Sequence, residues 1–90
     1  MFRVWGKLIK DNRMLKDYTA CIEDYTISRT KKVYKALDEI CYEFDLATPV
    51  WLKSNQDDFI RVAKTRFTQD NFIEHIDFDY LEFQVIEEDY

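Results

Sequence analysis

Hydrophobic residues follow two different periods along this 90-residue chain, and the change of period limits the folds open to it. Both ends alternate apolar and polar residues, as strands do, whereas the middle repeats apolar residues at helical spacing. Strands at both ends of a short chain, with helices between them, favour an α+β fold with an antiparallel sheet. We therefore expect a single domain over residues 1–90 with the element order β-β-α-α-β.

The N-terminal part predicts a β-hairpin. Residues 2–9 and 14–22 alternate, and Asp11 and Asn12 between them favour a turn because both tolerate left-handed backbone angles. Gly6 inside the first run indicates a bulge or a close backbone approach.

The middle of the chain predicts a helix over residues 30–45. Its apolar stripe consists of Val33, Leu37, Ile40, Cys41 and Phe44. Ser28 or Thr30 can cap the start of this helix, and Pro49 ends any helical segment before it.

The second half is less regular. Trp51 and Leu52 are expected to be buried anchors in a loop. Asn55 can cap a second helix from 56 to about 66, with Phe59, Ile60 and Ala63 facing inward. Thr68 can cap a short turn over 69–73. The phase of the alternation changes near Tyr80, which indicates either a bulge there or a separate lead-in over 75–79. The second alternative is favoured, so we expect a C-terminal strand over about 80–87. The expected architecture is a three-stranded antiparallel sheet, made of the hairpin and the C-terminal strand, with two helices packed on one face.

Composition favours a folded cytoplasmic domain. Aromatic residues make up 17% of the chain, which supplies a large apolar area for a short sequence. No apolar run approaches the roughly 18 residues that a membrane span needs, so we expect no membrane partner. The start has no secretory pattern, and Cys21 and Cys41 form no CxxC pair, so we expect both thiols to be reduced.

Catalytic chemistry is sparse, which favours a non-enzymatic protein without a cofactor. His75 is the only histidine, and Cys41 belongs to the apolar stripe of the helix, where cysteine packs as a small hydrophobe. One alternative is a metal-dependent enzyme, because His75, Asp77 and Asp79 share one side of an extended segment. A solvated polar side of that segment explains the same pattern and is favoured.

The charge order of the main helix is the reverse of what its dipole favours. Bases crowd its start and acids its end, although the free N–H groups of a helix start attract anions. The candidate contacts for a phosphate or a partner's carboxylates are Arg29, Thr30, Lys31 and Lys32, with Lys64 and Arg66 as outer candidates. The acidic C-terminal segment of the chain itself could neutralise the same bases, and this internal explanation is favoured.

These observations favour a small binding or adaptor module that recognises a protein partner or a phosphate-bearing ligand at the basic helix start. An alternative is nucleic-acid binding through the hairpin, whose candidate residues are Lys7, Lys10, Arg13 and Lys16, with Trp5 and Tyr18 nearby. A net charge of −5 and a pI near 4.8 disfavour nucleic acid. Trp5, Ile9 and Leu15, if they share the outer face of the sheet, would form an apolar patch suited to a homodimer.

Three segments carry a resemblance to a known group of proteins. These are residues 36–46 (ALDEICYEFDL), 64–73 (KTRFTQDNFI) and 76–83 (IDFDYLEF). With them the chain resembles a group of short bacterial proteins of about this length that have no assigned function. The resemblance covers most of the chain and implies a bacterial cytosolic protein, but it transfers no site residue.

Overall fold

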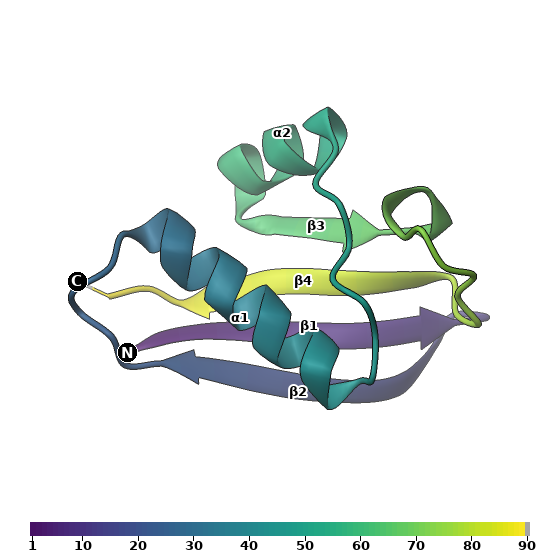
Figure 1. The fold of residues 1–90 in the computed structure, drawn as a ribbon, viewed down its shortest axis with the longest axis horizontal. Coiled ribbons are helices and arrows are strands. Elements are labelled where there is room, and N and C mark those ends of the chain that lie inside the picture. The colour runs from purple at the N-terminus through teal and green to yellow at the C-terminus, as the bar shows by residue number, and fades with distance from the viewer. Residues whose placement is uncertain (90) are drawn as a thin grey trace.

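The computed structural model describes residues 1–89 and shows an α+β domain (Figure 1). Strands β1 (Phe2–Lys10) and β2 (Arg13–Ile22) form the hairpin, and helices α1 (Arg29–Glu43) and α2 (Lys53–Val62) follow. Strand β3 (Lys64–Phe67), a short 3₁₀ helix η1 (Gln69–Asn71) and strand β4 (Tyr80–Glu87) complete the chain.

The sheet is antiparallel with the strand order β2-β1-β4-β3. The prediction of three strands is therefore wrong by one strand, because β3 pairs with β4 at the edge of the sheet. The hairpin and the strand over 80–87 are confirmed. Asp11 and Asn12 have φ values of 52° and 63°, the two left-handed positions that a tight two-residue hairpin turn requires.

Both helices cover the same face of the sheet. Helix α1 lies over β1 and β2, and α2 lies beside β3 (Figure 1). Phe59 of α2 stacks on Phe83 of β4, with 5.7 Å between the ring centroids. The core between the layers includes Phe2, Val4, Leu8, Ala20, Ile22, Leu37, Ile40, Phe67, Leu81 and Phe83.

Gly6 marks the closest approach of helix and sheet. A Cβ atom built on Gly6 would lie 2.6 Å from Cγ2 of Ile40, a separation that real Cβ atoms do not show. The sequence interpretation of a close approach is therefore confirmed at this residue. The irregularities of β1 lie elsewhere, at Leu8/Ile9 against β2 and at Arg3/Val4 against β4.

Asn55 does not cap α2 in the predicted way, since the helix begins earlier and Leu52 takes the cap position. Asn55 Oδ1 instead accepts a hydrogen bond from the Leu52 N–H at 3.0 Å. Its Nδ2 donates to the Thr65 hydroxyl and to the Arg66 carbonyl, each at 2.9 Å. Asn71 Nδ2 donates to Asn55 Oδ1 at 2.6 Å. This buried amide network joins α2, β3 and η1, which follow one another along the chain.

The second face of the sheet carries no helix within residues 1–89; we call it the open face. It presents the odd-numbered side chains of β1 and their neighbours on the other strands. Over the same part of the chain, neither helix is long and apolar enough to cross a membrane.

Candidate functional site

Helix α1 begins with four residues that sequence reasoning singled out. Ser28 caps it, as predicted, by accepting a hydrogen bond from the Lys31 N–H at 3.2 Å. The first turn contains no acid, so Arg29, Lys31 and Lys32 place positive charge where the helix dipole is already positive. The neutralising groups come from the other end of the chain.

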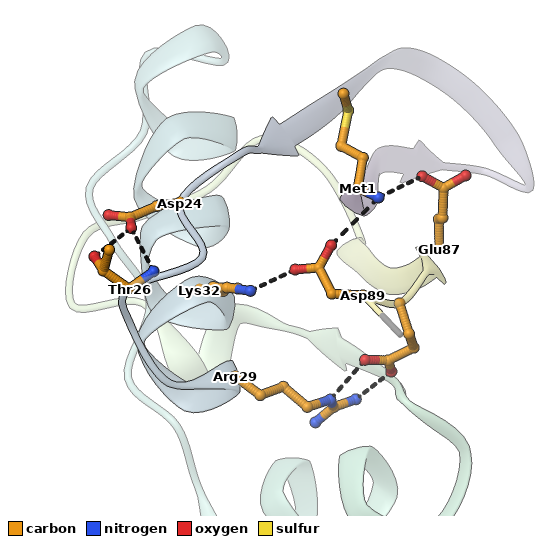
Figure 2. Close-up of polar contacts among 8 residues, drawn as sticks. Met1, Asp24, Thr26, Arg29, Lys32, Glu87 and Asp89 are labelled. Atoms are coloured by element: carbon orange, nitrogen blue, oxygen red, sulfur yellow. Dashed lines mark hydrogen bonds and ion pairs between the residues drawn. The ribbon is translucent and has the colours of Figure 1, made fainter.

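Glu88 and Asp89, which we call the acidic tail, pair with Arg29 and Lys32 at this helix start. Figure 2 shows Asp89 between Lys32 and Met1. The Glu88 carboxylate accepts two hydrogen bonds from Arg29, at 2.9 Å from Nε and 2.7 Å from Nη2. Asp89 binds the Lys32 ammonium and lies 3.3 Å from the Met1 amino group. Hydrogen bonds from Arg29 and Lys32 hold the pKa of Glu88 and of Asp89 below their ordinary values.

The acidic tail occupies two of the cations that were predicted to bind an external anion. Lys32 is buried, with only 7% of its surface exposed, and its ammonium is committed to Asp89. Arg29 is bound bidentately by Glu88. Lys31 is exposed and has no ion pair among residues 1–89. The internal neutralisation favoured at the sequence level is what the structure contains.

Lys64 and Arg66, the outer candidates, do not converge with the helix start. They belong to β3 and lie on the open face, where they surround Glu82 of β4. Lys64 lies 3.1 Å from the Glu82 carboxylate and Arg66 lies 4.0 Å from it. The sheet separates this group from α1.

A cleft between α1 and α2 opens beside the start of α1. We call it the α1–α2 cleft; it has a volume of about 260 Å³. Its lining includes Arg29, Thr30, Tyr34, Trp51, Phe59 and Ile60. Two of the predicted contact residues thus line a pocket, but the rest of its wall is mainly apolar.

Trp51 links the cleft to the aromatic core. Its ring makes edge contacts with Tyr34 at 6.1 Å, Phe59 at 5.5 Å and Phe67 at 5.0 Å between centroids. Its indole Nε1 is buried and has no hydrogen-bond partner among the described residues. A buried indole N–H normally donates to an acceptor, so the Trp51 N–H is an unsatisfied hydrogen-bond donor beside the cleft, as far as residues 1–89 show.

The three residues considered as metal ligands, His75, Asp77 and Asp79, make different contacts and do not form one site. His75 Nε2 lies 3.5 Å from an Asp77 oxygen, and both side chains are exposed. Asp79 instead accepts a hydrogen bond from the Asp11 N–H at 2.8 Å and so supports the hairpin turn. Within residues 1–89, no group of three or more His, Cys, Asp or Glu side chains could hold a metal ion.

The two cysteines differ in environment. Cys41 packs in the core, where burial raises the pKa of its thiol to about 12, and it is not a nucleophile at neutral pH. Cys21 is exposed on the edge strand β2 and is a free thiol.

The hairpin residues considered for nucleic-acid binding do not share one face of the sheet. Lys7 and Trp5 lie on the open face, whereas the Tyr18 hydroxyl donates to Glu39 of α1 on the helix side. Lys16 and Leu15 line a pocket on the helix side together with Phe44. The apolar patch of Trp5, Ile9 and Leu15 is therefore not formed, because Leu15 lies away from the other two.

Sequence reasoning missed the α1–α2 cleft for two reasons. Tyr34 lies outside the apolar stripe of the first helix, and Ile60 was expected to face the core, whereas it is 86% exposed at the rim of the cleft. Only Trp51 offered a signal, since it was expected to be a buried anchor in a loop. No family model matches the chain, and no curated protein or solved structure matches it either.

Proposed function

We propose that the protein is a small, non-enzymatic binding module that recognises a protein partner through the α1–α2 cleft. The partner inserts one large apolar side chain between the helices, against Trp51 and Phe59. The observation that carries this proposal is an aromatic-lined cleft whose rim is exposed and apolar.

The size of the cleft favours a side chain over a metabolite. Small-molecule sites usually enclose about 300–1,000 Å³ and bury most of the ligand. The α1–α2 cleft holds about 260 Å³ and is open to solvent. A single aromatic or branched aliphatic side chain fits a space of this size, and such anchors dominate protein–protein interfaces.

The rim supports the same conclusion. Ile60 is 86% exposed and Tyr34 is 51% exposed, at opposite walls of the cleft. Neither residue contributes its full apolar area to the core. A partner that covers both would bury apolar surface that residues 1–89 leave in water.

The polar end of the cleft limits the role of charge. Arg29 lines the cleft while its guanidinium binds Glu88. A phosphate or carboxylate from outside would have to displace the acidic tail, which is held at high local concentration by the chain. Burial of the apolar side chain therefore supplies the affinity. An acidic group of the partner would contribute affinity only by replacing Glu88 as the partner of Arg29.

Site-specific photo-crosslinking in the native host tests the proposal. A benzophenone amino acid at position 60 should crosslink a protein, whereas the same group at position 73 should not. Ile73 is a matched control because it is 95% exposed and does not line the cleft.

The partner identified in this way would then be titrated against purified variants. We expect Ile60→Asp and Tyr34→Ala to weaken binding by about tenfold or more, as for central interface residues. Ile73→Asp should leave affinity within about twofold of the wild type. Equal crosslinking at both positions, or unchanged affinity in both cleft variants, would remove the α1–α2 cleft as the binding site.

A further inference from the structure

The open face carries a group of cations around one buried carboxylate. Glu82 is only 6% exposed although it lies on the face without helices. Lys7 and Lys64 each lie 3.1 Å from its carboxylate, and Arg66 lies 4.0 Å away. Burial alone would raise the pKa of Glu82, but the two ammonium groups outweigh it and hold that pKa below its ordinary value.

This arrangement leaves positive charge uncompensated. Lys7, Lys64 and Arg66 surround Glu82, and Asp17 of β2 lies opposite Lys7, so the centre of the open face has one positive charge in excess. The side chains of the face that are charged at neutral pH are Arg3, Lys7, Lys64 and Arg66 against Asp17, Glu82 and Glu87. The face is therefore net positive on a chain whose total charge is −5, which makes it complementary to an anion.

Two of these cations lie on aromatic rings. Lys7 Nζ is 4.1 Å from the centroid of Trp5, and the Arg66 guanidinium is 4.5 Å from the centroid of Tyr80. A guanidinium stacked on a ring gives a flat, cationic surface, and the side chain of Arg66 is 58% exposed. Unstacked bases lie on aromatic rings and on guanidinium planes of this kind.

We propose that the open face binds single-stranded nucleic acid. The phosphates follow Lys7 and Lys64 across the sheet, and a base stacks on Arg66 above Tyr80. A duplex fits less well, because no helix of the described chain projects from this face into a groove. An acidic peptide satisfies the charge but leaves the stacking surface unused. This binding is separate from the proposed function, since the sheet lies between the open face and the α1–α2 cleft.

Fluorescence anisotropy with labelled oligothymidine and oligouridine of about 12 nucleotides, within the footprint of known single-strand binders, tests this inference. We expect both probes to bind, with affinity falling steeply between about 50 and 200 mM salt. A preference for one of them would separate a DNA ligand from an RNA ligand. An oligoglutamate peptide of similar length and charge serves as the competitor.

Matched variants assign the binding to the face. Arg66→Ala should weaken binding about fivefold or more by removing both a charge and a stacking plane. Arg61→Ala is the control, because Arg61 is 70% exposed on α2 and away from the open face. Lys64→Gln should weaken binding and reduce the salt slope by about one, whereas Lys53→Gln on α2 should not.

The two tryptophans give an independent readout that does not depend on the label. In Trp51→Phe only Trp5 on the open face remains, and oligothymidine should quench its emission by stacking nearby. In Trp5→Phe, Trp51 should not respond to the oligonucleotide. The inference is overturned if neither probe binds at low salt, or if the α2 controls lose as much affinity as the β3 variants. It is also overturned if oligoglutamate competes as well as unlabelled oligothymidine, because that result would indicate an acidic protein surface as the ligand.

Discussion

Gly6 shows how one residue without a side chain sets the distance between α1 and the sheet. The Ile40 side chain occupies the space that any Cβ on Gly6 would need. Ile40 is itself fully buried, so it cannot move aside into solvent. The close packing of helix on sheet at this point therefore depends on glycine, and any other residue would force the Ile40 side chain or the backbone to shift.

Gly6→Ala should lower the free energy of unfolding by about 1–3 kcal/mol, as expected when a methyl group is forced into a packed core. Urea unfolding of Gly6→Ala, Ile40→Ala and the double variant measures it. Because Ile40→Ala removes the atom in conflict, the double variant should lose less than the two single losses together. Additive losses would show that Gly6 is needed for another reason.

Ala63 is a second residue with an unusual backbone. It ends α2 in the left-handed region, with φ 54° and ψ 34°, where its Cβ is strained. Glycine normally takes this position at a helix end. The sequence therefore gave no stop signal there, and the predicted helix was extended through Ala63 to about Arg66.

Ala63→Gly should raise the free energy of unfolding by up to about 1 kcal/mol, because relief of strain exceeds the added entropy of the unfolded chain. Thermal unfolding followed by circular dichroism measures the change. Ala47→Gly is a control in an exposed loop and should be neutral or destabilising. A loss of stability in Ala63→Gly would contradict the strain assigned to this residue.

At the scale of elements, prediction succeeded where a local pattern decides the structure. The hairpin, the helix around the stripe of Val33 to Phe44, and β4 follow from hydrophobic period and turn chemistry alone. Strand β3 did not follow, because its four residues gain their strand geometry from pairing with β4 across the sheet. Lys64 and Arg66 therefore fell within the predicted second helix and were named as outer candidates for the anion site, although strand pairing directs them to the open face.

The acidic tail and the start of α1 form a second element-scale feature that charge order alone indicated. Reversed dipole charges in α1 predicted a compensating anion, and the tail supplies it. The α1–α2 cleft had no comparable signal, since its walls come from elements whose relative placement depends on the whole core.

Glu88→Gln should destabilise the protein by about 0.5–1 kcal/mol at neutral pH, because Arg29 loses a bidentate partner. The folded pKa of Glu88 lies below its ordinary value of 4.5. Its stabilisation is therefore present above 4.5 and disappears as pH falls through the lower folded value. Urea unfolding at about pH 7, 5 and 3 should show the difference from wild type closing at acid pH.

Glu74→Gln is the matched control, since Glu74 is exposed in the loop before β4 and makes no ion pair within residues 1–89. It should change stability by less than about 0.5 kcal/mol at each pH. If Glu88→Gln matches this control at neutral pH, the acidic tail does not stabilise the helix start.

At the scale of the whole molecule, the sheet separates two surfaces with different chemistry. The helix side holds the apolar α1–α2 cleft, and the other side holds the cationic open face. Each surface contains one tryptophan, Trp51 and Trp5, so a single-tryptophan variant reports on each separately. Under the two proposals made above, a partner in the α1–α2 cleft and an oligonucleotide on the open face would contact opposite sides of the sheet.

Strands β1 and β4 are antiparallel neighbours in the sheet, and this pairing makes the chain suited to circular permutation. The Met1 amino group lies 3.3 Å from Asp89, and Figure 2 shows the two residues facing each other. A short linker between them would turn β4 and β1, already antiparallel neighbours, into consecutive strands. New ends could then be opened between Asp11 and Asn12, and such a circularly permuted chain should reach the same arrangement of strands by a different order of assembly.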